Sequence, residues 1–144
     1  MAECMFKLIK KNGTIIIEIQ YLLNTLKDLT FDNIYHEHYN YWSLTSLVNF
    51  FDNFNAKVYR AERLETHGGS LRIYIKKSSK IKIENSVKNL LKEENKFGIK
   101  NYKTYQEFSK KVYKIRENVR RNYTSTRSFI KKLRFNRRRS SKLR

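Results

Sequence analysis

All three histidines of this 144-residue chain fall in two short motifs, and these motifs are where chemistry is expected. The first motif is Tyr35-His36-Glu37-His38, and the second runs from Thr66 to Arg72 with the sequence Thr-His-Gly-Gly-Ser-Leu-Arg. A histidine accepts a proton near neutral pH, and a neighbouring carboxylate can hold its tautomer and raise its basicity. A tyrosine hydroxyl can donate a hydrogen bond to an oxyanion as it forms. The first motif thus holds the side chains that proton removal next to a carbonyl requires.

Both motifs also have a plain structural interpretation, which the residues by themselves leave open. The first would then be a half-buried aromatic loop. The second would be a hairpin turn at Gly68-Gly69, where the lack of side chains lets the backbone approach another group closely. Neither interpretation involves catalysis, and both fit the spacing of the motifs.

Metal binding is the other chemical interpretation of the histidines. His36 and His38 lie two residues apart, so in an extended segment both would point to one face and could share a metal ion. A third ligand would have to come from His67, Glu37 or Cys4, and none of these has a spacing that requires it. We therefore predict no metal site.

The elements around the first motif follow from the apolar pattern. Residues 14–20 (TIIIEIQ) are β-branched and almost continuously apolar, which is typical of a strand buried on both faces of a parallel sheet. Residues 21–29 carry leucines at helical spacing, and residues 31–42 show no clean period and are predicted as an ordered loop. Ser43 is a suitable N-cap for a following helix. Two alternating strands, separated by the Gly68-Gly69 turn, complete this part.

The second half of the chain is helical in pattern and strongly basic. Helices are predicted over residues 83–95 and 101–122, with a break at Gly98. Residues 1–77 hold 10 Lys and Arg against 8 Asp and Glu, whereas the remaining residues hold 22 against 5. From Arg120 onward there are 11 basic residues and no acidic one. We predict three parts: residues 1–77 (α/β domain), 78–123 (helical extension) and 124–144 (basic, disordered tail).

This positive charge has a functional and a structural interpretation. Lysines and arginines with interleaved tyrosines could bind RNA or another polyanion, with the tyrosines as stacking surfaces. Alternatively, the lysines are ordinary solvated positions on helix surfaces. Weak binding to polyanions without sequence preference follows from either interpretation.

The composition also indicates where the protein works. Cys4 is the single cysteine, so no intramolecular disulfide can form, which fits a reducing compartment. No apolar run reaches the roughly 18 residues that span a bilayer. Glu3, Lys10 and Lys11 do not fit the layout of a signal peptide. We therefore expect a cytoplasmic protein without a membrane partner.

Residues 13–77 resemble a stretch of the SAM-dependent C-methyltransferases that act on keto-deoxysugar nucleotides. That family has a strand ending in Glu-Val-Pro-Tyr, a loop with Phe-Asp-x-Ile-Tyr-His-Glu-His, an aromatic-Ser segment and a His-Gly-Gly-Ser-Leu-Arg hairpin. The corresponding segments here are Glu18 to Tyr21 (with Gln20 in place of the proline), Phe31 to His38, Tyr41 to Ser43, and His67 to Arg72.

The resemblance implies a fold, a reaction and roles for residues. The fold would be α/β, the C-terminal part of a Rossmann-like class I methyltransferase sheet followed by a helical extension. A base would remove the proton next to the ketone of a dTDP-4-keto-6-deoxysugar, and the resulting enolate carbon would attack the methyl group of S-adenosylmethionine. His38 would be this base, Glu37 its partner or a ligand of a sugar hydroxyl, and Tyr35 the stabiliser of the oxyanion. Structural or supporting roles, including contacts to substrate, fall to the remaining candidates: His36, His67, Ser70 and Arg72.

Parts of the family pattern are missing from the sequence. A glycine-rich strand-to-helix turn and a following acidic residue normally bind the cofactor, and neither is found here. The family's N-terminal zinc-binding cysteines are also missing. We therefore expect a fragment truncated at both ends, with a shifted reading frame near its end, that is inactive alone and binds no S-adenosylmethionine. The alternative is a small basic nucleic-acid-binding or structural protein that uses the sheet as a scaffold.

Overall fold

The computed structural model describes residues 2–10, 12–34, 36, 38–78 and 80–140, the side chains of residues 2, 67 and 128–140 excepted. Two compact units, residues 1–105 and 106–144, make up the chain. The elements of the first unit before its last helices are α1 (Ala2–Leu8), β1 (Ile15–Gln20), α2 (Leu22–Asp28), η1 (Phe31–Asn33), α3 (Leu44–Asp52), β2 (Lys57–Leu64), η2 (Thr66–Gly68) and β3 (Ser70–Lys76). Two helices follow, α4 (Asn85–Phe97) and α5 (Tyr102–Ser140). The predicted α/β class is confirmed, whereas the Rossmann-like assignment stays a prediction.

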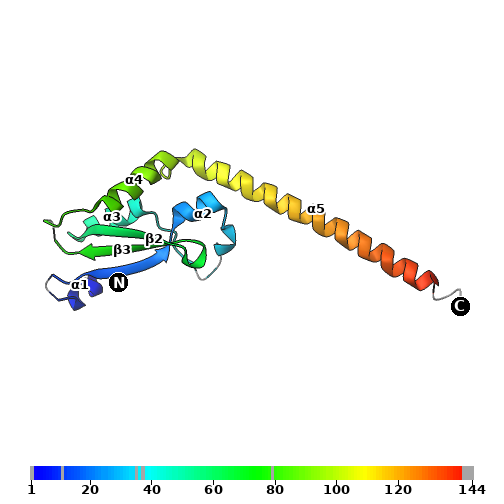
Figure 1. Cartoon of the computed structure of the whole chain (residues 1–144), viewed down its shortest axis with the longest axis horizontal. Coiled ribbons are helices and arrows are strands. Elements are labelled where there is room, and N and C mark those ends of the chain that lie inside the picture. The colour runs from blue at the N-terminus through cyan, green and yellow to red at the C-terminus, as the bar shows by residue number, and fades with distance from the viewer. Residues whose placement is uncertain (1, 11, 35, 37, 79, 141–144) are drawn as a thin grey trace. The chain divides into compact units, whose positions relative to one another are not determined.

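The sheet has three strands in the order β1-β3-β2 (Figure 1). β3 pairs antiparallel with both neighbours, so β1 and β2 run in the same direction without touching. The sequence predicted that β1 would be buried on both faces of a parallel sheet, and this is wrong for the described residues. β1 pairs there only with β3, and Ile16 is 57% exposed. Ile15, Ile17 and Ile19 lie on the face toward the helices, whereas Ile16 and Glu18 lie on the open face.

One face of the sheet forms the core. Because side chains alternate along a strand, every second residue of β3 points to this face, and Leu71, Ile73 and Ile75 have no exposed surface. α3 and α4 contact each other and β2, and they cover this face with apolar side chains. The buried apolar residues of these helices and of β2 are Leu44, Leu47, Phe51, Val58, Ala61 and Val87. Burying each large aliphatic side chain stabilises the fold by about 1.5 to 3 kcal/mol.

The opposite face of the sheet is polar. Arg72 of β3 lies opposite Glu18 of β1 and Glu62 of β2 in the strand register. Its guanidinium donates to Glu18 at 2.9 Å, and the Tyr74 hydroxyl donates to Glu62 at 3.0 Å. Arg60 also pairs with Glu62 and lies 5.0 Å from the centre of the Tyr74 ring. These groups are largely solvated, so each pair contributes little to stability.

The two helices of the second half are confirmed, with one change of boundary. Gly98 ends α4 in the left-handed conformation (φ 78°), which confirms the predicted break. α5 begins near the predicted position but continues to Ser140, where the sequence predicted a tail from residue 124. No glycine or proline occurs after Gly98, so no residue there forces the helix to stop. Neither α5 nor any other described helix is both long enough and apolar enough to cross a bilayer.

The division into residues 1–77, 78–123 and 124–144 stays a prediction, and amide exchange tests its last part. Helical amides between residues 124 and 140 should exchange within seconds. A helix without tertiary packing is only marginally stable, and repulsion between its like charges destabilises it further. Amides of β3 in the same sample serve as the protected reference. Slow exchange throughout residues 124–140 would contradict the predicted tail.

Candidate functional site

The first histidine motif lies between the carboxyl end of β1 and the start of α3. Tyr35 and Glu37 are outside the described residues, so their proposed roles stay predictions. His36 is exposed and His38 is half-buried. The ring of His38 lies 6.5 Å from that of Tyr41, tilted by 37°. A half-buried histidine beside an aromatic ring is compatible with a proton acceptor that a substrate can still reach.

Tyr41 also bonds the end of the loop that carries the first motif to the residues before this motif. Its hydroxyl donates to the carbonyl oxygen of Asn33 at 2.9 Å, so the chain after the motif is bonded to η1 before it. From the sequence alone, Tyr41 is assigned only to an aromatic segment. Its contact with His38 depends on how the loop folds back, which spacing along the chain does not reveal.

Both ends of the segment that carries the loop meet next to the sheet. The amide of Leu22 donates to the carbonyl of Trp42 at 3.0 Å, and Tyr21 and Trp42 form a parallel bridge. The amide of Tyr21 donates to the carbonyl of Gly69 at 3.2 Å. The chain therefore leaves the sheet at the end of β1 and returns to the same place at Trp42. The second motif is hydrogen-bonded to this place through Gly69.

α3 begins where this excursion ends, and its cap is the predicted one. The hydroxyl of Ser43 accepts from the amide of Ser46 at 3.0 Å, and the hydroxyl of Ser46 accepts from the amide of Ser43 at 3.0 Å. This capping box satisfies two backbone donors reciprocally. Two further amides of the first turn donate to a residue far along the chain, Glu94 of α4.

Both glycines of the second motif have positive φ angles, and packing restricts one of them, Gly69. Gly69 has a φ of 108°, and a Cβ atom built there would lie 2.0 Å from Nδ2 of Asn24 in α2. The predicted close approach of the backbone is therefore confirmed, with Asn24 as its partner. At Gly68 a Cβ would lie 3.6 Å from Nδ2 of Asn33 and 3.8 Å from Cγ2 of Thr30. The Gly68-Gly69 turn of the second motif thus packs against α2 and η1, the elements that precede the first motif.

The other candidates of the second motif have separate surroundings. Ser70 is buried, and its hydroxyl donates to the carbonyl of Thr66 at 3.1 Å, which is a structural role. Arg72 lies on the polar face of the sheet, where its hydrogen bond to Glu18 raises the pKa of the guanidinium. Only the backbone of His67 is described, within η2. The structure therefore brings the Gly68-Gly69 turn to the segment that precedes the first motif, and it places Arg72 beside Glu18.

This end of the sheet also holds unused hydrogen-bonding groups. Nε2 of Gln20 and Oγ1 of Thr30 are buried and have no hydrogen-bond partner, the two such side-chain atoms in the part of the chain that is described. An unsatisfied buried polar group costs about 1 to 3 kcal/mol. Gln20 is the residue that stands in place of the family proline. Among the described residues, no group of three or more His, Cys, Asp and Glu could hold a metal ion.

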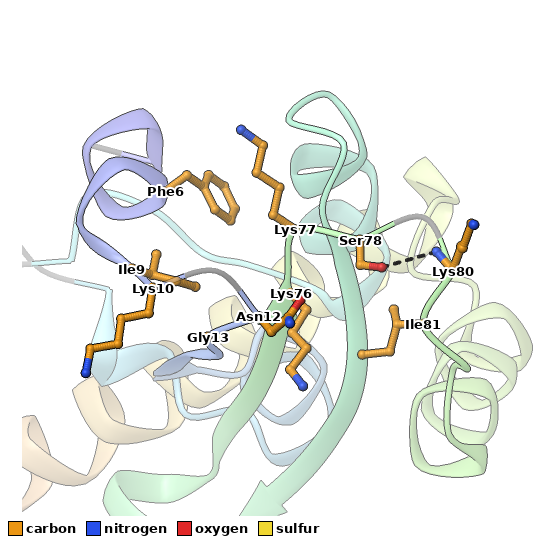
Figure 2. Close-up of a pocket in the computed structure, with 10 residues that line it drawn as sticks. All are labelled: Phe6, Ile9, Lys10, Asn12, Gly13, Lys76, Lys77, Ser78, Lys80 and Ile81. Atoms are coloured by element: carbon orange, nitrogen blue, oxygen red, sulfur yellow. Dashed lines mark hydrogen bonds between the residues drawn. The ribbon is translucent and has the colours of Figure 1, made fainter.

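A cavity of about 500 Å³ lies at the other end of the sheet, between α1 and residues 76–81. Four lysines line it together with the apolar side chains of Phe6, Ile9 and Ile81. Figure 2 shows that the lysine ammonium groups point in different directions. They do not converge on one point as the donors of an anion site do. This cavity therefore does not extend the candidate site.

Comparisons with known proteins agree with the motifs. Residues 65–133 match the family model of the C-methyltransferase C-terminal domain. The chain is 32% identical over 114 residues to the C-methyltransferase NovU of Streptomyces niveus, which covers 78% of this chain and 27% of NovU. The chain thus spans about a quarter of the length of this relative. Together the two matches support a C-methyltransferase family for this chain.

The packing of the two glycines yields a prediction that is independent of function. Gly69→Ala should lower the free energy of unfolding by about 1 to 3 kcal/mol for the left-handed backbone, and further for the collision with Asn24. Gly68→Ala is the matched control, because it has a positive φ but only ordinary contact distances. Urea denaturation would measure both variants. Equal destabilisation would show that the Asn24 contact does not restrict position 69.

Proposed function

We propose that this chain is a segment of a C-methyltransferase that methylates a keto-deoxysugar nucleotide, and that it supplies the proton-removing side of the active site. The observation that carries this proposal is the packing of the Gly68-Gly69 turn, at the carboxyl end of β1, against the segment that leads into the first histidine motif. β1 and β2 run in the same direction and both end here, beside Ser70 of β3. In parallel α/β sheets, ligands bind outside the carboxyl ends of the strands. The similarity to NovU supports the reaction class, and the sugar nucleotide comes from the motif resemblance.

His38 is proposed as the general base. It would take the proton from the carbon next to the substrate ketone, and the electron pair of the broken C–H bond would move onto the ketone oxygen. A group that accepts this proton works best with a pKa near the working pH, as histidine has. Tyr35 would donate a hydrogen bond to the oxyanion, and Glu37 would hold the imidazole or a sugar hydroxyl.

S-adenosylmethionine is the expected methyl donor of the whole enzyme, but the described residues do not fit it. A glycine-rich turn between a strand and a helix is the usual binding element. Here a Cβ at Gly13 would lie 2.6 Å from Ile9, Gly69 packs on Asn24, and Gly98 caps α4. Each of these glycines has a local packing role. We therefore assign only the proton-removing step to residues of this chain.

A chimera with NovU tests the proposed function. The aligned segment of NovU would be replaced by the corresponding residues of this chain, and C-methyltransferase activity would be measured. We expect an active chimera in which His38→Ala lowers turnover about a hundredfold or more, as for a lost general base. His36→Ala is the matched control, since this exposed histidine lies two residues away.

Two results would contradict the proposal. Equal losses for the two histidine variants, with folding intact, would remove the assignment of the base. A folded chimera that forms no methylated product would count against the reaction class itself.

We further propose that the basic half binds polyanions weakly. Of the exposed large side chains, Tyr102, Tyr113 and Tyr123 lie on α5 among lysines and arginines. The affinity for two unrelated RNA oligomers should be similar and should fall steeply between low and physiological salt, because binding releases counterions. Fluorescence anisotropy at two salt concentrations measures this. A strong preference for one oligomer would instead favour a dedicated nucleic-acid-binding protein.

A further inference from the structure

Glu94 of α4 is a buried carboxylate that the proposed reaction does not use. It has no exposed surface, and it is the one charged side chain that is buried among the described residues. A buried charge is strongly unfavourable unless hydrogen bonds satisfy it. Glu94 accepts four: from Tyr21 Oη (2.9 Å), Leu44 N (2.6 Å), Thr45 N (2.8 Å) and Thr45 Oγ1 (2.5 Å).

The four donors come from the two ends of the loop-bearing segment. Tyr21 directly precedes α2, and Leu44 and Thr45 form the first turn of α3. The segment 22–43 contains the first histidine motif. The residues that flank it on both sides are therefore hydrogen-bonded to a single carboxylate. The parallel bridge between Tyr21 and Trp42 lies beside this contact and depends on the same approach of the two ends.

On this basis, and resting on the proposed role of His38, we propose that Glu94 is a positioning residue for the candidate base. It acts through Tyr21 and the start of α3, which fix both ends of the loop. Within that loop the hydroxyl of Tyr41 bonds to Asn33, and its ring lies beside His38. Removing the carboxylate should loosen both ends of this loop. The contacts around His38 should then loosen as well.

The chemistry of the contact requires a carboxylate of this length. The four donors face two oxygens that can only accept, and a negative charge is favoured at the amino end of a helix. A glutamine would turn its NH₂ group toward at least one of these donors, so that two donors face each other. Burial, followed by the negative charge of Glu94, raises the pKa of the Tyr21 hydroxyl well above its ordinary value. Tyr21 therefore stays protonated and continues to donate at every physiological pH.

The neighbouring Glu93 provides a matched control. It lies on the same helix, with a side chain 34% exposed, and pairs with Lys27 at 2.5 Å and Arg63 at 3.1 Å. Exposed pairs of this kind contribute little. Glu93→Gln removes the same charge one residue away and leaves the start of α3 untouched.

The experiment compares Glu94→Gln, Glu93→Gln and the unaltered full chain by NMR. In the unaltered chain, the ring protons of His38 should be shifted by the Tyr41 ring relative to those of exposed His36. In Glu94→Gln this shift should disappear, and the amides of residues 22–43 should exchange about tenfold faster or more. Amides of β3 should keep their protection, because local opening leaves the central strand paired. Glu93→Gln should match the unaltered chain.

Two results would overturn the proposal. An unchanged His38 shift with unchanged exchange in residues 22–43 would show that the loop is held without Glu94. An equal acceleration of exchange in β3 would show that Glu94 acts on overall stability alone. If Glu94→Gln does not fold, Tyr21→Phe removes one of the four donors and should give the same pattern to a smaller extent. These measurements need no activity, so an inactive chimera would refute the proposed function without deciding the role of Glu94.

Discussion

The carboxylate of Glu94 has no contact with solvent, and a charge in that position is tolerated only because four donors surround it. These donors are separated from it by 49 to 73 residues along the chain. Joining such distant segments has an entropic cost that the contact must offset. The observed positions of α2 and α3 therefore depend on the docking of α4.

This constraint connects a part of the chain that the family model matches with a part that precedes the match. The family match begins at residue 65, so it includes the second motif and α4, but the first motif precedes it. Glu94 lies within the part that the family model matches, and its donors lie on both sides of the loop that precedes this match. The side chains assigned to chemistry thus depend on a helix that itself carries no candidate catalytic residue.

Local features of the sequence predicted local features of the structure. The strands, the Ser43 cap and the break at Gly98 each follow from a pattern within a few residues, and all are confirmed. The pairing of β1 could not be predicted this way, because an apolar strand looks the same at an edge as in the middle of a sheet. Glu94 was missed for a similar reason. It stands beside Glu93 in a helix rich in lysine, and only the tertiary fold distinguishes the buried carboxylate from the solvated one.

Burial, more than charge, decides which of the charged residues matter to the site. Arg72 belongs to the motif that marks the family resemblance, yet it lies on the open face of the sheet with Glu18, where water screens the pair. Glu94 belongs to none of the quoted motifs, but the absence of water strengthens each of its hydrogen bonds and makes a missing one expensive. General-base catalysis requires the base to lie within hydrogen-bonding distance of the proton it removes. A loop of irregular structure meets that requirement only when its ends are held, and the buried carboxylate is the group that holds both.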